Sequence, residues 1–320
     1  MTQQSTPQPL TGIAVTYNGR GGYEVIQTRE REVRPPAAGE VRIQVKAAAV
    51  NPTDLLLRAA GAGAEGASIV PGMDAAGIVE SVGAGVERLR PGDNVMAAVM
   101  PRRPEGGAQA QYIVVPAASV VPVPEGASFE EAATLPMNGL TALLALDHAN
   151  VSRGQVLGVS GGAGLLAGYA IAAAKQRGLQ VVADAKPEDI AWVKRYGADI
   201  VVPRGEDFAA AVRHALPEGI DALLDTAVLG ERTFAAIRDG GVYLPLRGWA
   251  GKPAERGIQI KPVFVHEALE RTGWLEQLRE WVAARAITLR VTHTYAPQDA
   301  AAAQRSLQGG GLRGRPVIVF

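Results

Sequence analysis

The chain has 320 residues, enough for about two domains at roughly 150 residues each. Its 32 Lys and Arg residues balance 32 Asp and Glu residues, so no net charge attracts a nucleic acid or an anionic membrane. The count of 0 Cys excludes disulfides, thiolate nucleophiles and cysteine-ligated zinc or iron–sulfur centres. Hydrophobic residues make up 47% and charged residues 20%, which indicates a folded globular chain.

The first part of the chain, from Thr11 to about Pro124, consists of short strand-like runs separated by Gly and Pro. The expected strands cover 12–17, 41–45, 77–82, 94–99 and 111–115. Breakers such as Pro71-Gly72 and Pro91-Gly92 fall between these runs, where the fixed φ of proline suits a turn. This part therefore predicts a small barrel that is rich in strands and poor in helices.

After Pro124 the pattern changes to alternating helices and strands. A helix is expected from Ser128, because Glu130 and Glu131 follow in its first turn. Expected strands then cover 155–159, 179–183, 199–202, 220–224 and 241–244, with helices over 165–177, 188–196, 207–215 and 232–237 between them. This alternation predicts a doubly wound parallel sheet, so the fold class is α/β. A helix at 274–284, a strand at 289–291, a helix at 297–307 and a strand at 316–319 complete the chain.

One stretch is long enough to test a membrane-spanning interpretation. The 21 residues of 154–174 carry no charge, but Gly158, Gly161, Gly162 and Gly164 interrupt any helix in the first half of this stretch. Strand–turn–helix is the better prediction, so no membrane partner is expected. Met1 to Gln8 is polar and lacks the pattern of a secretory signal, which predicts a cytoplasmic protein.

A glycine-rich turn stands between an apolar strand and an alanine-rich helix. Small residues at such a turn let the backbone approach a pyrophosphate, and the free N–H groups of the helix start attract its charge. The sequence therefore predicts a dinucleotide site; the alternative is a purely structural glycine turn. The residues expected to bind the cofactor here are Ser160, Gly161, Gly162, Ala163, Gly164, Leu165 and Leu166.

Three charged residues give opposite indications about the cofactor. Asp184 lies at the end of the next strand, 184 − 164 = 20 residues after Gly164, where a carboxylate accepts from ribose hydroxyls and favours NAD(H). Lys186 and Arg204 could instead pair with a 2′-phosphate and favour NADP(H). The choice between NAD(H) and NADP(H) therefore stays open.

Several motifs occur in the order and spacing of one known family. They are Val50-Asn51-Pro52-Thr53-Asp54, Val70 to Gly77, Pro91 to Val95, Gly106 to Tyr112, the glycine turn, and Leu312-Arg313-Gly314-Arg315. Through them the chain resembles the medium-chain dehydrogenase/reductase superfamily, in its zinc-independent quinone oxidoreductase branch. The resemblance implies a GroES-like β-barrel catalytic domain over 1–125 and 286–320, and an inserted Rossmann domain over 126–285. It also implies a cleft between the two domains, a preference for NADP(H), and a homodimer.

The resemblance also implies that both zinc sites of the related alcohol dehydrogenases are lost. Those relatives carry a cysteine where Asn51 to Asp54 stand, and a His-Glu pair where Met73-Asp74 stand. The histidines are scattered without ligand spacing, so no metal site is expected. Without a Lewis acid, a simple alcohol is a poor hydride donor, because nothing stabilises the developing alkoxide.

The resemblance assigns further site residues. Asn51 is the candidate catalytic group, and a turn residue before Pro52 is the alternative. Asn138 and Thr141, at the start of a helix, are expected near the nicotinamide, with helix capping as their alternative. Thr226 and Ala227 follow one sheet strand, and Leu246 and Arg247 follow the next, so all four stand where such sheets bind ligands.

These observations predict an NAD(P)H-dependent reductase of a quinone or an α,β-unsaturated carbonyl, acting on a small-molecule substrate. A conjugated acceptor spreads the developing charge, so positioning beside reduced nicotinamide can suffice. An enoyl reductase acting on a thioester or a specialised metabolite is an alternative. A catalytically silent NAD(P)-binding sensor is another.

Overall fold

The computed structural model describes residues 8–61, 68–205, 207–253 and 255–320. These form two compact units. Unit 1 contains the described residues up to Met137 together with Leu269–Ala283 and Leu289–Phe320. Unit 2 contains Asn138–Ala268 and Ala284–Thr288. The chain therefore leaves unit 1, forms unit 2, and returns to complete unit 1.

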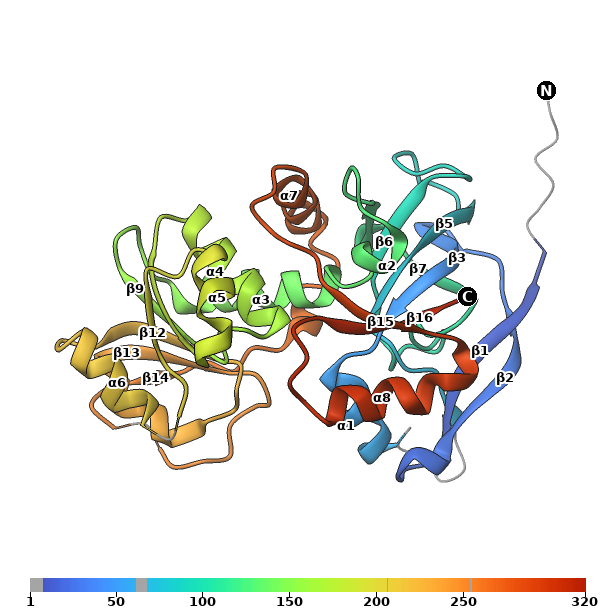
Figure 1. Ribbon diagram of the computed structural model, residues 1–320. Coiled ribbons are helices and arrows are strands. Elements are labelled where there is room, and N and C mark those ends of the chain that lie inside the picture. The colour runs from blue at the N-terminus through green and yellow to red at the C-terminus, as the bar shows by residue number, and fades with distance from the viewer. Residues whose placement is uncertain (1–7, 62–67, 206, 254) are drawn as a thin grey trace. The chain divides into compact units, whose positions relative to one another are not determined.

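Unit 1 is built from two mainly antiparallel sheets (Figure 1). In the first, β1 (Leu10–Asn18) lies between β2 (Ile26–Val33) and β4 (Ser68–Ile69). The second has the order β15-β16-β3-β5-β6-β8, and β7 also pairs with β3. Its strands are β3 (Glu40–Ala49), β5 (Asp74–Val82), β6 (Asn94–Ala98), β7 (Tyr112–Pro116), β8 (Val120–Pro122), β15 (Val291–Tyr295) and β16 (Arg315–Val319). The C-terminal strands thus return to the N-terminal sheet, as the resemblance implies.

Small aliphatic side chains fill the core of unit 1. Alternate residues of β3, namely Val41, Ile43 and Val45, are fully buried, as expected for a strand with one face on the core. Val79 on β5 and Val95 on β6 pack in the same cluster. With aromatic residues at only 5% of the chain, this packing is achieved by Val, Ile and Ala.

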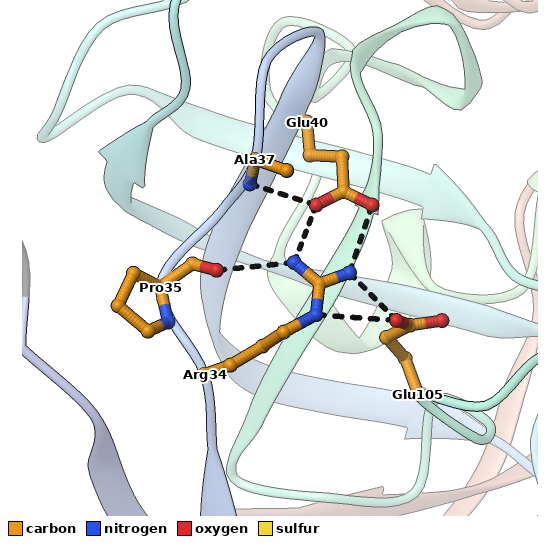
Figure 2. Close-up of polar contacts among 5 residues, drawn as sticks. All are labelled: Arg34, Pro35, Ala37, Glu40 and Glu105. Carbon is orange, nitrogen blue, oxygen red and sulfur yellow. Dashed lines mark hydrogen bonds and ion pairs between the residues drawn. The ribbon is translucent and has the colours of Figure 1, made fainter.

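An ion-pair cluster ties two loops of unit 1 together (Figure 2). The guanidinium of Arg34 donates to both carboxylate oxygens of Glu40, at 2.6 and 2.9 Å, and to Glu105 Oε1 at 2.6 Å. Hydrogen bonds to Arg34 hold the pKa of Glu40 below its usual value. The cluster therefore stabilises the connection before β3 against the loop that carries Glu105.

Unit 2 is a parallel six-stranded sheet in the order β11-β10-β9-β12-β13-β14. The strands are β9 (Val156–Ser160), β10 (Gln180–Ala185), β11 (Ile200–Pro203), β12 (Ile220–Asp225), β13 (Ile237–Pro245) and β14 (Gln259–Ile260). Numbered within the unit, this is the order 3-2-1-4-5-6 of the Rossmann fold. The direction of winding reverses between β9 and β12, which makes that point the expected ligand site.

Helices α4 (Leu165–Gln176), α5 (Ile190–Arg195) and α6 (Phe208–Ala215) pack on this sheet (Figure 1). Helix α3 (Pro136–Ala149) begins at the end of unit 1 and continues into unit 2. The alanine-rich sequence of α4 buries most of its side chains, so the helix lies close against its strands. The predicted α/β class is confirmed.

The remaining helices belong to unit 1 and are α1 (Pro52–Ala60), α2 (Phe129–Ala132), α7 (Thr272–Ala283) and α8 (Ala300–Gln308). The predicted start at Ser128 is confirmed, because its Oγ accepts from Glu131 N at 3.2 Å. The predicted domain boundaries put the helix after Gly273 in the Rossmann domain, whereas α7 belongs to unit 1. Thr272 Oγ1 donates to the carbonyl of Ala118 at its start.

Several local predictions differ from the structure; for example, the strand expected over 289–291 is β15 at Val291–Tyr295. Strand β2 was not predicted, because positive and negative residues alternate over 29–32 and Val33 is the one buried residue of this strand. Helix α1 was not predicted either, although Pro52 is favourable at a first helical position. The helix expected over 232–237 is a 3-10 helix over Gly230–Ala236, and Ile237 already belongs to β13.

Candidate functional site

The glycine turn of unit 2 connects β9 to α4 at the reversal of the sheet. Gly161 has a φ of +71°, in the left-handed region that favours glycine. A Cβ on Gly162 would lie 2.7 Å from the carbonyl oxygen of Asp184. Gly164 is the N-cap of α4, so the N–H groups of Leu165 and Leu166 stand in the first turn, where no helical carbonyl reaches them. This is the geometry that binds a pyrophosphate.

The carboxylate of Asp184 is turned toward this turn. Asp184 is 3% exposed, and its Oδ1 accepts from Gly161 N at 2.5 Å and from Gly162 N at 3.3 Å. The pKa of Asp184 is raised above its usual value, because burial outweighs the opposing effects of these hydrogen bonds and of the charge of Arg204. Asp184 is therefore a buried side chain that stabilises the glycine turn through hydrogen bonds to its backbone.

A second carboxylate, Asp225, organises the end of β12. Its Oδ1 accepts from Ser160 Oγ at 2.6 Å, and its Oδ2 accepts from the Tyr243 hydroxyl at 2.8 Å. Burial, followed by the charge of Asp225, raises the pKa of Tyr243, which keeps that hydroxyl a donor. Asp225 thereby joins the ends of β9, β12 and β13.

Most of the predicted cofactor residues lie at one edge of this sheet. Ser160 pairs with Asp225 in the β9–β12 ladder, and Asp225 pairs with Pro245 in the β12–β13 ladder. Carboxyl ends of parallel strands meet at one edge, which brings together residues from five segments. They are Ser160, Gly161, Gly162, Ala163, Gly164, Leu165 and Leu166 after β9, Asp184 and Lys186 at the end of β10, Arg204 after β11, Thr226 and Ala227 after β12, and Leu246 and Arg247 after β13.

Two predicted cofactor residues lie on helix α3 and not at this edge of the sheet. Asn138 and Thr141 lie in the first half of α3 and are 1% and 5% exposed. Their role near the nicotinamide stays a prediction.

Unit 1 contains a buried polar cluster of Asn51, Asp54, Asp74 and Arg315. Arg315 Nε donates to Asn51 Oδ1 at 2.8 Å, and Asn51 Nδ2 donates to Asp74 Oδ2 at 2.6 Å. A guanidinium only donates and a carboxylate only accepts, so these neighbours fix the orientation of the Asn51 amide. Asn51 is fully buried, and these two contacts hold both ends of its amide in place.

The two carboxylates of the buried polar cluster also fix the backbone around them. Asp74 Oδ1 accepts from Met137 N at 2.6 Å. Asp54 accepts from Asn51 N at 2.7 Å and from Gly72 N at 2.9 Å. Burial raises the pKa of Asp54 and of Asp74 to about 7, and the nearby charge of Arg315 opposes both shifts.

Asn51 was predicted as the catalytic group, and that role stays a prediction. The roles of Asp54, Asp74 and Arg315 were missed, although the motifs that contain them were recognised. Asp54 follows Asn51 by three residues in sequence, which is the spacing of a capping pair and could have indicated their contact. In the described part of the chain, no three His, Cys, Asp or Glu side chains are grouped as a metal site requires. None of the described helices is both long and apolar enough to cross a membrane.

The fold and the glycine turn together define a dinucleotide-binding Rossmann unit joined to a GroES-like unit. The profile of the alcohol dehydrogenase GroES-like domain matches residues 37–125, and that of the zinc-binding dehydrogenase family matches residues 178–318. The chain belongs to the medium-chain dehydrogenase/reductase superfamily, in its quinone oxidoreductase-like branch.

Three known proteins illustrate this relationship. The 2-methylene-furan-3-one reductase of Solanum lycopersicum is 30% identical over 80% of this chain and 68% of its own length. The chloroplastic NADPH-dependent alkenal/one oxidoreductase of Arabidopsis thaliana is 31% identical over 77% of this chain and 65% of its own length. The structure of mycobacterial Rv1454c complexed with NADPH superposes with a TM-score of 0.83, at 26% identity, covering 96% of this chain and 100% of that one.

Proposed function

We propose that this protein is an NADPH-dependent reductase of α,β-unsaturated carbonyl compounds or quinones. The observation that carries the proposal is the glycine turn, which lies at the reversal point of a 3-2-1-4-5-6 sheet and leads into an alanine-rich helix. Two relatives named for the reduction of conjugated carbonyls support the acceptor class. A quinone shares this chemistry, because it is also a conjugated carbonyl.

The reduced nicotinamide, when bound, would supply a hydride. In unit 2, the N–H groups at the start of α4 would hold the pyrophosphate of the cofactor, and Asp184 would keep the glycine turn in place. Ser160 and Asp225 would fix the neighbouring strand ends. A conjugated acceptor delocalises the charge that develops on its oxygen, so a general acid or water can deliver the proton afterwards. Asn51 in unit 1 stays the candidate catalytic group that the resemblance implies.

The residues favour a mechanism without zinc. The buried polar cluster carries an amide, two carboxylates and a guanidinium, and its carboxylates already accept from amide N–H groups. A zinc site instead uses thiolate, imidazole or carboxylate ligands without a cation among them. Elemental analysis of active protein would test this point, and stoichiometric zinc would contradict it.

We propose NADPH as the preferred cofactor. The Asp184 carboxylate is committed to Gly161 and Gly162, so it is poorly placed to repel a 2′-phosphate. Arg204 is exposed after β11, and its backbone N–H donates to Ala185 O at 2.9 Å, beside the end of β10. A guanidinium there can pair with a 2′-phosphate. The name of the Arabidopsis relative agrees with this preference.

An Arg204→Gln variant tests the cofactor preference. The ratio of kcat/KM for NADPH to that for NADH should fall about tenfold, as expected for one charge-assisted contact. Arg238→Gln is the matched control, because Arg238 pairs with Asp221, which lies near the opposite end of β12. An unchanged ratio in Arg204→Gln would remove the proposed phosphate contact.

The activity itself is tested by NADPH oxidation with a panel of enones, quinones and enoyl thioesters. Turnover of the enones or quinones supports the proposal. Turnover confined to thioesters identifies an enoyl reductase, and tight NADPH binding without turnover identifies a sensor. The homodimer that the resemblance implies is a separate proposal, tested by light scattering of the purified protein.

A further inference from the structure

One residue at the candidate cofactor site has an unfavourable backbone conformation. Val228 has a φ of +56° and is 49% exposed. Within the described ranges, the other non-glycine residues with positive φ are Asn150, Arg256 and Arg285, none of which is β-branched. A β-branched residue in this region is strained, and such strain persists only where neighbouring contacts impose it.

The contacts that impose this conformation come from both sides of Val228. Before it, Thr226 Oγ1 donates to the carbonyl of Ser160, and Ala227 N donates to Ser160 Oγ at 3.0 Å. After it, Gly230 N donates to Asp225 Oδ2 at 2.8 Å. Since Ser160 Oγ also donates to Asp225, the two ends of the turn are fixed by one connected network.

This strained turn lies directly against the glycine turn. A Cβ on Gly161 would lie 2.9 Å from Thr226 Oγ1 and 3.3 Å from the Cβ of Ala227. Both turns follow the strands between which the sheet reverses, β9 and β12. The adenosine half of a dinucleotide belongs over β9 and β10, where its ribose is read, so the nicotinamide half belongs over β12 and β13.

We propose that Val228 is an apolar contact for the nicotinamide half of the cofactor, and that Asp225 and Ser160 hold it in strain for that purpose. The inference rests on the proposed cofactor binding. Val228 is a half-exposed aliphatic side chain on a turn that its neighbours make rigid, so it can cover one face of a planar ring without an ordering cost. The strained backbone at Val228 thus lowers the stability of the ligand-free protein and raises its affinity for the cofactor.

Two variants separate this role from a merely structural one. Val228→Gly removes the strain and the side chain, so the ligand-free protein should melt about 1–4 °C higher. Val228→Ala removes two methyl groups and should melt close to the wild type. Both variants should bind NADPH about three- to tenfold more weakly, because each buried methyl group contributes up to about fourfold in affinity. A structural role would instead move stability and affinity in the same direction.

Arg285→Gly is the matched control, because Arg285 has a φ of +59° on an exposed segment that follows α7 and not a strand of the sheet. It should raise the melting temperature and leave the NADPH dissociation constant unchanged. The constants are measured by fluorescence titration with NADPH, and the melting temperatures by calorimetry. Wild-type affinity for NADPH in either Val228 variant, or a lower melting temperature in Val228→Gly, would overturn the inference. If the wild type itself does not bind NADPH, the proposed function is refuted together with this inference. If the wild type binds NADPH and the Val228 variants bind it equally well, only the inference is refuted.

Discussion

The buried polar cluster makes the stability of unit 1 depend on one guanidinium. Arg315 is 9% exposed and donates to Asn51, which in turn donates to Asp74. Its charge lowers the pKa of both Asp54 and Asp74 against the effect of burial. We expect Arg315→Gln to leave two buried carboxyl groups without that compensation, and its cost should depend on pH.

The size and sign of this cost follow from the two pKa values. With values of about 7 in the folded state, both carboxyl groups are mainly ionised at pH 8 and mainly protonated at pH 6. An acid whose folded pKa lies above its unfolded pKa stabilises the protein fully below the unfolded value, and this stability is lost as the pH rises through the folded value. Arg315→Gln raises both folded pKa values further and so increases the total stability that is lost as the pH rises.

At pH 8 the variant should therefore lose about 1–2 kcal/mol more in free energy of unfolding than at pH 6, because two buried ionised carboxyl groups have then lost a nearby positive charge. At pH 6 the cost should be about 1–3 kcal/mol and should come mainly from lost hydrogen bonds, including the one to Asn51. Urea unfolding followed by tryptophan fluorescence measures both values. The matched control is Arg315→Lys, which retains a positive charge and should show a smaller difference between the two pH values. An equal cost of Arg315→Gln at pH 6 and pH 8 would refute this electrostatic account.

Two further substitutions test the glycine turn and the surface ion pairs. Gly162→Ala places a Cβ 2.7 Å from the carbonyl oxygen of Asp184, so it should lower the free energy of unfolding by about 1–3 kcal/mol and weaken NADPH binding. Gly205→Ala is the control, because a Cβ on Gly205 has nothing within 4 Å. Arg34→Gln should cost only about 1 kcal/mol, because Arg34 is 42% exposed at its side chain. Unfolding in 1 M salt should shrink that cost, and so should acid that protonates Glu40, whose pKa is lowered by Arg34. A cost that is independent of salt would contradict the ion-pair explanation.

The parts of the fold that local sequence encodes were predicted well. Alternating helices and strands predicted the parallel sheet, because each element carries its own periodicity and its own caps. Ser128 is an example, since its capping contact reaches only to Glu131. The strand β2 was missed because an exposed edge strand with alternating charges buries too little apolar surface to show a period.

The same distinction applies to the candidate site. The glycine turn could be predicted because its glycines, its strand and its helix are contiguous in sequence. The contact between Asn51 and Arg315 spans 264 residues, and that between Ser160 and Asp225 spans 65. Separations in sequence of this size leave no local pattern, and these side chains come together only through the pairing of strands in the folded sheets.

The case of Asp184 shows why even a well-placed residue can have an unexpected role. Its distance from the glycine turn in sequence suggested a ribose contact, but the spacing does not determine to which side of β10 the carboxylate points. Side chains alternate along a strand, so a shift of one residue decides between the ligand and the interior. Here the carboxylate accepts from Gly161 N and Gly162 N, and Arg204 is the nearby cation whose charge lowers the pKa of Asp184. Asp184, which the sequence pattern assigns to the cofactor ribose, thus holds the glycine turn in place, and the proposed preference for NADPH rests on Arg204.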